Sequence, residues 1–108
     1  MVSHEQGVCT IALNRPEVFN SFDQAMGKAF QEALDAAAEN PSVRCVVVTG
    51  NGRAFCAGQD LKEVTAPDAP DFTDIVENTY NKSIRRIRSM EKPVIGAING
   101  VAAGAGAN

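Results

Sequence analysis

The spacing of hydrophobic residues along the chain predicts strands that alternate with helices. Loose alternation of apolar and polar residues at 8–13 indicates a short strand. The β-branched run within 43–49 is typical of a strand buried on both faces. A further apolar run at 94–98 indicates another strand. The pattern therefore predicts three strands of ordinary length, distributed over the whole chain.

Two longer segments between these strands have helical periodicity. The first helix is expected to begin at Ser21, as an N-cap with Gln24 as its capping-box partner, and to end at Asn40. The second is expected over about 72–90, with Pro93 beyond its end. The expected buried stripes are Phe22, Met26, Phe30, Ala33, Leu34 and Ala37 in the first helix, and Ile75, Val76, Tyr80, Ile84 and Ile87 in the second.

Shorter features complete the order of elements. An extended piece at 54–56 leads into a glycine turn and a short helix at 60–64, and the segment 65–71 with its two prolines is expected to be a loop. The order is strand, helix, strand, turn, helix, strand and turn, which predicts an α/β fold with mainly parallel strands. A length of 108 residues allows one domain at most, or a part of a larger one.

Composition and charge narrow the partners that we expect. The net charge of −3 gives no basic footprint for nucleic acid, and the basic cluster at 82–88 interleaves with apolar residues as on a solvated helix face. No apolar run reaches transmembrane length, so we expect no membrane partner, and the N-terminus lacks the regions of a signal peptide. The cysteines Cys9, Cys45 and Cys56 include no Cys-x-x-Cys pair, which favours a reduced, cytoplasmic setting without disulfides or structural zinc.

Several kinds of active site are excluded by the residues present. The single histidine, His4, lies in a terminus that is expected to fray, so neither a Ser-His-Asp nor a Cys-His device is available, and no cluster has metal-ligand spacing. Asp60 and Glu63 are interpreted as a cap and a solvated residue rather than as a catalytic dyad. The glycine pair at 50–52 fails the dinucleotide fingerprint at Phe55, and the P-loop sequence is missing.

Two glycine turns that follow predicted strands offer a different chemistry. Gly58 permits a close approach or an unusual φ, so the N–H of Gln59 is expected to point outward at a helix start. Gly104 is expected to do the same for the N–H of Ala105. Two unpaired N–H groups aimed at one point form an oxyanion hole, which holds a thioester oxygen as it becomes an enolate.

The same residues resemble the N-terminal part of the enoyl-CoA hydratase/isomerase (crotonase) superfamily. The matching segments are Ile-Ala-Leu-Asn-Arg-Pro at 11–16 with Asn20, Val-Val-Val-Thr-Gly at 46–50, Phe-Cys-Ala-Gly-Gln-Asp-Leu at 55–61, Lys-Pro-Val-Ile at 92–95, and the glycine turn at 99–106. The match begins near residue 7 and reaches the last residue. Because members of the superfamily are more than twice as long, we expect residues 1–108 to be the N-terminal portion of a single acyl-CoA-binding domain, with the C-terminal remainder absent.

The resemblance implies a spiral core of repeated ββα units, a homotrimer or hexamer, and an acyl-CoA substrate bent into a pocket. It implies no separate cofactor, because coenzyme A is part of the substrate. By position, the backbone N–H groups of Gln59 and Ala105 are the implied oxyanion donors. The implied contacts to substrate or CoA are Val18, Ala57, Gly58, Asp60, Leu61, Lys62, Gly104 and Asn108, where Lys62 is either a point charge for a CoA phosphate or a plain surface lysine.

One departure from the family pattern bears on the reaction. Hydratases of this family carry a glutamate at the position of Asn108, and an asparagine cannot act as a general base, although it can orient a substrate or a water. The glycine turn at 99–108, with Tyr80, Asn81 and the basic segment at 84–88, is similar to the branch that converts ring-1,2-epoxyphenylacetyl-CoA to an oxepin in phenylacetate breakdown. In that branch a downstream aspartate moves protons. Lys82 departs from the branch pattern, which has proline there.

The leading hypothesis is therefore an acyl-CoA isomerase of the epoxyphenylacetyl-CoA type. An enoyl-CoA hydratase or an enoyl-CoA delta-isomerase is the alternative among enzymes. A truncated, catalytically silent chain that binds CoA or a partner subunit is an alternative of another class, and a dinucleotide-binding module is a weaker one. An acidic residue beyond Asn108 would favour the enzyme. Because helices and strands without partners expose apolar faces, we expect the isolated 108-residue chain to fold poorly or aggregate.

Overall fold

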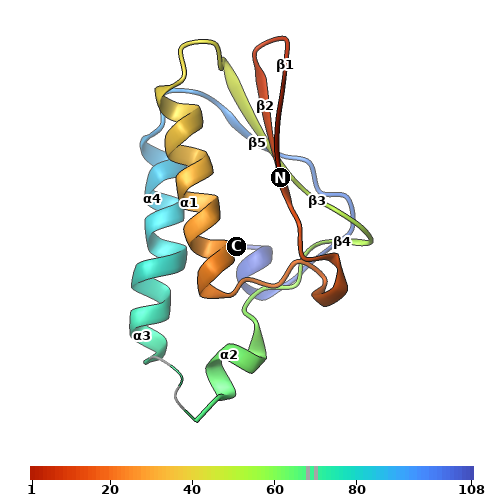
Figure 1. Ribbon diagram of the computed structural model, residues 1–108, viewed down its shortest axis with the longest axis vertical. Helices are drawn as coiled ribbons and strands as arrows, with labels where there is room; N and C mark the ends of the chain where they lie inside the picture. Colours follow the sequence, from red (N-terminus) through yellow and green to blue (C-terminus); the bar gives the residue numbers. More distant parts are fainter. Residues whose placement is uncertain (68, 70) are drawn as a thin grey trace.

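The chain forms an α/β fold built on a four-stranded sheet and a small second sheet (Figure 1). The computed structural model describes residues 1–67, 69 and 71–108, with the backbone alone at Phe72. The first sheet has the order β1-β2-β3-β5, and the second pairs β4 with β6. The strands are β1 (Val2–Glu5), β2 (Val8–Leu13), β3 (Cys45–Gly50), β4 (Ala54–Cys56), β5 (Val94–Gly96) and β6 (Val101–Ala102).

The pairing of the strands confirms the prediction of a mainly parallel arrangement. Strands β2 and β3, β3 and β5, and β4 and β6 are parallel, and β1 and β2 alone are antiparallel within the described part of the chain. The parallel strands need long crossovers, and the two helical segments supply them. The short strand β6 was not predicted, because two residues carry no periodicity.

The N-terminus corrects the expectation of a frayed end. Val2–Glu5 forms the edge strand β1, in which the exposed His4 pairs with Cys9. A two-residue turn connects β1 to β2, with positive φ at both Gln6 (51°) and Gly7 (83°). Such turns match the twist of a hairpin, and asparagine or aspartate usually occupies the first position. Glutamine at that position is why the sequence pattern did not reveal the hairpin.

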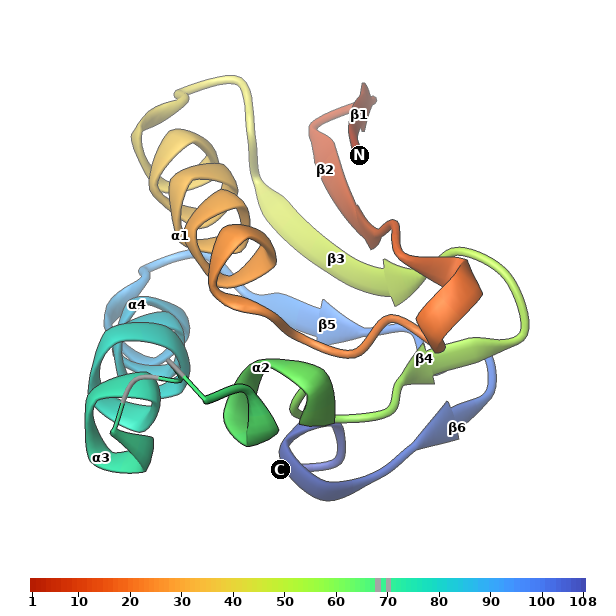
Figure 2. The ribbon, with the colours of Figure 1, turned by 60° about the horizontal axis from the view of Figure 1, so that its bottom comes forward.

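A layer of helices covers one face of the four-stranded sheet (Figure 2). Helix α1 (Gln24–Glu39) ends where predicted, with Asn40 as its C-cap. Its N-cap is Asp23, whose Oδ1 accepts a hydrogen bond from the Met26 N–H at 2.8 Å, and not Ser21 as predicted. A carboxylate at this position satisfies a free N–H and faces the positive end of the helix.

The second helical segment is continuous but changes its helical type. It consists of α3 (Phe72–Ile75), the π-helical η2 (Val76–Asn81) and α4 (Lys82–Ser89). Thr79 and Ser83 are buried in place of Ile84, which is 47% exposed. A π-helical turn holds more residues than an α-turn, so it rotates the following residues about the axis. Thr79 also lies so close to α1 that a Cβ on Gly27 would be 2.4 Å from its Cγ2.

The core lies between this helix layer and strands β2 and β3. Alternate residues of both strands face it, and the opposite residues of β3 are only half-buried, so the prediction of a strand buried on both faces is wrong within this chain. The core residues are Cys9, Ile11, Leu13, Phe22, Leu34, Ala37, Val43, Val46, Val48, Phe55 and Cys56. Three apolar side chains are more than half exposed, those of Ile95, Ile98 and Val101. Exposed apolar surface favours association, which is consistent with aggregation of the isolated chain, and that aggregation stays a prediction.

The connection before the second helix begins with the short helix α2 (Leu61–Thr65). Its N-cap is Asp60, as predicted, and the side chain accepts a hydrogen bond from the Lys62 N–H. The predicted loop at 65–71 includes residues 68 and 70, which lie outside the described residues. In the part of the chain that the structure describes, no helix is long and apolar enough to cross a membrane.

Candidate active site

The first glycine turn joins β4 to α2 and is fixed by a parallel bridge to Phe22. Gly58 is buried and adopts a φ of +101°. Its carbonyl accepts a hydrogen bond from the Phe22 N–H at 2.7 Å, and the Asp60 N–H donates to the Phe22 carbonyl at 2.8 Å. Gln59 stands between these two bonds, so its own N–H faces away from Phe22. The N–H of Gln59 has no hydrogen-bond acceptor among the described residues.

The second glycine turn follows β6 and closes into the 3-10 turn η3 (Gly104–Gly106). Gly104 has a φ of +54°, and the N–H groups of Ala107 and Asn108 donate to its carbonyl at 3.1 and 3.2 Å. The N–H of Ala105 has no acceptor in residues 1–67, 69 and 71–108. Each turn therefore carries one backbone donor that the described chain leaves free.

The two turns pack backbone against backbone, and Figure 2 shows η3 beside the loop that leads into α2. A Cβ on Gly58 would lie 3.0 Å from the Ala103 carbonyl oxygen and 3.4 Å from the Ala105 nitrogen. A Cβ on Gly106 would lie 2.2 Å from the Cys56 carbonyl oxygen, which no side chain allows. The absence of these side chains is what brings the two free donors into the same part of the molecule.

A loop at 14–20 supports the start of β4, the strand that leads into the first turn. The Asn20 side chain is fully buried, and it accepts a hydrogen bond from the Arg15 N–H at 2.8 Å. Its Nδ2 donates to the carbonyl oxygens of Asn51 and Ala54, both at 2.9 Å. Asn20 has a φ of +58°, a conformation that asparagine adopts more readily than most residues. One buried side chain thus ties the loop to both ends of the turn before β4.

The Arg15 guanidinium connects this loop to the start of α2. Its Nη2 donates to Asp60 Oδ2 at 3.0 Å, and its Nη1 lies 3.5 Å from Asp23 Oδ2. Burial alone would raise the pKa of Asp60, but Arg15 and the N–H groups of Lys62 and Glu63 outweigh it and hold that pKa below its usual 3.8. Asp60 is therefore a charged structural residue. This link joins residues that are 45 positions apart, so no local sequence pattern reveals it.

The structure gathers most of the predicted CoA contacts around the start of α2. Val18, in the 3-10 turn η1 (Pro16–Val18), is near Ala57 because the Ala57 N–H donates to the Phe19 carbonyl at 3.0 Å. Ala57 and Lys62 are exposed, and Leu61 is 72% exposed, so this surface is open to solvent. Gly104 is also exposed, whereas Asn108 lies apart from this surface, at a cavity on the other side of the turns.

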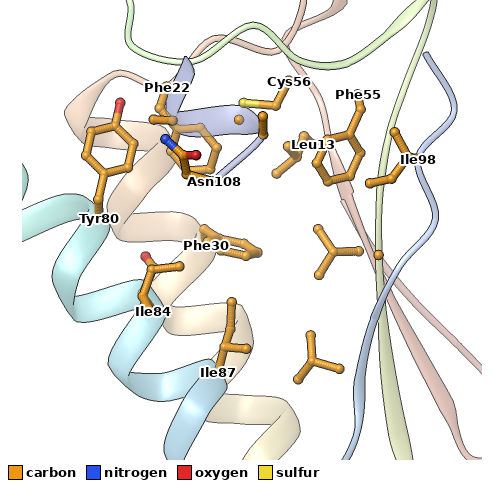
Figure 3. Close-up of a pocket in the computed structure, with 17 residues that line it drawn as sticks. Leu13, Phe22, Phe30, Phe55, Cys56, Tyr80, Ile84, Ile87, Ile98 and Asn108 are labelled. Atoms are coloured by element: carbon orange, nitrogen blue, oxygen red, sulfur yellow. The ribbon is translucent and has the colours of Figure 1, made fainter. Parts of the chain in front are cut away.

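That cavity has a volume of about 270 Å³ and lies between the helix layer and the sheet (Figure 3). One end is formed by residues 105–108, and the walls are apolar and aromatic. The rings of Phe22 and Phe30 meet edge to face at 5.8 Å, and Phe22 and Tyr80 are 6.0 Å apart. Among the described residues, no carboxylate lines this cavity.

Tyr80 was predicted to be a member of a buried stripe, but its hydroxyl makes a polar contact. The Tyr80 O–H donates to Gln59 Oε1 at 2.5 Å, and Gln59 Nε2 donates to Glu63 Oε1 at 3.3 Å. Burial and the negative charges of Cys56 and Glu63 raise the pKa of Tyr80 to about 12. The signal for this contact was absent from the sequence, because the partners come from three separate elements.

The remaining candidate chemistry at the site is weak. Burial raises the pKa of the Cys56 thiol, and the hydrogen bond from the Gly58 N–H offsets this only in part. A thiol with a raised pKa is a poor nucleophile at neutral pH. Among the described residues, no group of histidine, cysteine and carboxylate side chains could hold a metal ion. The arrangement is best suited to stabilising a negative oxygen through backbone N–H groups.

Comparison with known proteins gives a consistent result. The family model described as enoyl-CoA hydratase/isomerase matches residues 3–108. The chain is 49% identical to the 1,2-epoxyphenylacetyl-CoA isomerase of Escherichia coli K12, covering 99% of this chain and 42% of that protein. It is 37% identical to the 2,3-dehydroadipyl-CoA hydratase of the same strain, covering 98% of this chain and 40% of that protein.

A solved structure extends the comparison to the fold. The enoyl-CoA hydratase of Bacillus anthracis superposes with a TM-score of 0.91 at 34% identity, covering 98% of this chain and 42% of that one. The crotonase-like α/β fold is therefore present along the chain. The chain spans about two fifths of the length of the relatives it matches.

Proposed function

Because the chain belongs to the enoyl-CoA hydratase/isomerase family, we propose that the backbone N–H groups of Gln59 and Ala105 form the oxyanion hole of an acyl-CoA isomerase. The observation that carries the proposal is the contact between the two glycine turns. Each turn contributes an N–H without an acceptor among the described residues, and the Ala105 nitrogen lies 3.4 Å from the Cβ position of Gly58.

The chemical role of these donors follows from the charge that develops. When a proton leaves the carbon next to a thioester, the electron pair moves onto the thioester oxygen and gives an enolate. Two N–H groups already aimed at that oxygen stabilise the enolate without reorganisation, and loss of one donor typically costs about 3–4 kcal/mol in the transition state. The proton itself needs an acid or base, which we propose lies outside residues 1–108, since no carboxylate lines the cavity in the described part of the chain.

The substrate that we propose is ring-1,2-epoxyphenylacetyl-CoA, which would rearrange to an oxepin-CoA in phenylacetate catabolism. The relative that is 49% identical is named for acting on that CoA ester. Asn108 supports an isomerisation, because its amide can orient a substrate but cannot take the proton that addition of water requires. Coenzyme A enters as part of the substrate, and no separate cofactor belongs to the proposal.

We place the CoA portion on the exposed surface around the start of α2. The exposed backbone and apolar side chains of this surface suit the pantetheine, and an exposed lysine can contact a phosphate as a point charge. Asp60 contributes by holding the loop through Arg15. The residues proposed for this surface are Val18, Ala57, Gly58, Asp60, Leu61 and Lys62. A trimeric or hexameric assembly is part of the same proposal, and light scattering of the purified protein tests it.

The proposal is tested by an enzyme assay on the protein as its natural source produces it. Conversion of ring-1,2-epoxyphenylacetyl-CoA to an isomer of equal mass, with a much lower kcat/KM for adding water to a 2-enoyl-CoA, is the expected result. Efficient hydration without ring isomerisation would support the hydratase instead, and the 37% identical relative carries that name. Binding of CoA esters without turnover would support a silent binding chain.

A further inference from the structure

A short chain of side-chain hydrogen bonds connects the second helical segment to the first glycine turn. It starts at the Tyr80 hydroxyl in η2, passes through the Gln59 side chain, and ends at Glu63 in α2. Glu63 is held in turn, because its Oε2 accepts a hydrogen bond from the Gln24 N–H at 2.9 Å. The residue that supplies the proposed oxyanion donor is therefore fixed from three elements.

The direction of each bond follows from the groups available. An ionised Glu63 can only accept, so the Gln59 amide must turn its Nε2 toward it and its Oε1 toward Tyr80. Tyr80 must then donate its proton to Gln59. The same Nε2 also donates to the Asp60 carbonyl at 3.2 Å, which bends the side chain back along the start of α2.

Gln59 is thus held at both its backbone and its side chain. The bridge to Phe22 fixes the peptide groups on either side of Gln59, and Phe22 packs against the Tyr80 ring at 6.0 Å. The π-helical turns at Val76–Asn81 bring Tyr80 to this point on the helix face. Rotation of the Gln59 peptide would have to break the bridge, and movement of the residue as a whole would also have to break the Tyr80 contact.

We propose that Tyr80 is a positioning residue that acts through the Gln59 side chain to aim the Gln59 N–H at the thioester oxygen. The inference rests on the proposed oxyanion hole. The Tyr80 hydroxyl bonds to Gln59 while its ring lines the cavity, so removal of the hydroxyl alone leaves the cavity wall in place. Loss of the hydroxyl is therefore expected to weaken stabilisation of the enolate while leaving the binding of the CoA ester nearly unchanged.

The test compares Tyr80→Phe, Gln59→Leu and the double variant, made in the protein at the length its source makes. Tyr80→Phe is expected to lower kcat about tenfold and to change KM less than about twofold, compared with the roughly hundredfold loss that follows removal of a whole oxyanion donor. Because Gln59→Leu keeps the backbone N–H but removes the contact, the double variant is expected to be no slower than either single one. Asn81→Ala is the control, since it removes an exposed hydrogen bond to Glu77 from the same helical turns.

A second readout separates this inference from the proposed function. The probe is the CoA thioester of an amino-substituted cinnamate, whose absorption moves to longer wavelength when hydrogen bonds draw charge onto the thioester oxygen. The unsubstituted protein and Asn81→Ala are expected to give a full shift, and Tyr80→Phe a smaller shift at similar affinity. No shift in the unsubstituted protein would overturn the oxyanion hole itself. A full shift and unchanged kcat in Tyr80→Phe, or losses that multiply in the double variant, would overturn the role of Tyr80 alone.

Discussion

The two glycine turns offer the same kind of donor, but they are held in different ways. Side chains hold the first turn through Arg15 to Asp60 and through Tyr80 to Gln59, and Asn20 holds the start of β4, the strand that leads into it. The second turn is held by its own backbone bonds and by contact with the first. Because the second turn is placed by its contact with the first, a change that moves the first turn is expected to displace both donors.

The side-chain support of the second turn lies at its start. Asn99 accepts a hydrogen bond from the Gly50 N–H at 3.0 Å and donates to the carbonyl oxygens of Gly52 and Ala54, each at 3.2 Å. In the described part of the chain, no side chain makes a hydrogen bond to residues 103–108. The placement of the Ala105 donor therefore depends on the steric fit at Gly106 and on the hydrogen bond from the Ala103 N–H to the Cys56 carbonyl at 3.0 Å. This difference sets the order of the effects expected below.

The largest effect is expected when the contact between the turns is broken. In Gly106→Ala the new Cβ would fall 2.2 Å from the Cys56 carbonyl oxygen, so we expect a loss of about 4 kcal/mol in unfolding free energy. Gly104→Ala is the matched control, because its Cβ would meet nothing within 4 Å and only its φ of +54° is unfavourable, at about 1 kcal/mol. Denaturant unfolding of both variants measures the difference, and equal losses would contradict the packing argument.

The next effect concerns the buried side chain that holds the start of β4, the strand that leads into the first turn. Asn20→Ala leaves the Arg15 N–H and the Asn51 carbonyl oxygen without their buried partner, while the Ala54 carbonyl oxygen keeps the hydrogen bond from Asn99, so a loss of about 2 kcal/mol in unfolding free energy is expected. Asn51→Ala removes an exposed hydrogen bond to Asn14 and is expected to change stability by less than about 0.5 kcal/mol. A loss in Asn51→Ala as large as that in Asn20→Ala would show that burial of Asn20 has no special weight.

A smaller effect tests the charge that links the loop to α2. Asp60→Asn keeps an N-cap but removes the negative partner of Arg15, and we expect a loss of about 1 kcal/mol at neutral pH. The folded protein holds the pKa of Asp60 below 3.8, so this stabilisation is present above 3.8 and is lost as the pH falls through the lower folded value. Unfolding at neutral and at acid pH measures it. A difference from the unsubstituted protein that persists at the lowest pH would point to lost packing instead.

The sequence predicted the order of elements well because apolar periodicity reports local geometry. The parallel strands, the α2 cap at Asp60 and the end of α1 are confirmed. The errors concern the cap of α1 and the face of the second helical segment. Asp23 caps α1 instead of Ser21, and the π-helical turns at Val76–Asn81 bury Thr79 and Ser83 while Ile84 lines the open cavity, a change that no three- or four-residue spacing encodes.

The features of the candidate site are of two kinds, those that are local in the sequence and those that join distant residues. The glycines at 58 and 104 could be identified from the sequence, because positive φ is a local property that glycine tolerates. The hydrogen bonds of Arg15 and Tyr80 to the first turn could not, because each joins residues that are far apart in the chain. The roles given to Gln59, Ala105 and the CoA surface stay predictions until a ligand is bound.

The smallest effect is the titration of Tyr80, which reports how far the first turn is closed to water. Burial, together with the negative charges of Cys56 and Glu63, raises the pKa of Tyr80 from 10.0 to about 12. Between these values the folded chain keeps a proton that the unfolded chain releases, so Tyr80 stabilises the fold below 10.0 and this contribution is lost as the pH rises to about 12. Tyr80 is the only tyrosine of the 108 residues, so the phenolate absorbance that disappears in Tyr80→Phe belongs to it. Glu63→Gln removes one of the charges and should lower the midpoint, whereas a midpoint near 10.0 in the unsubstituted protein would mean that water reaches the first turn as freely as the second.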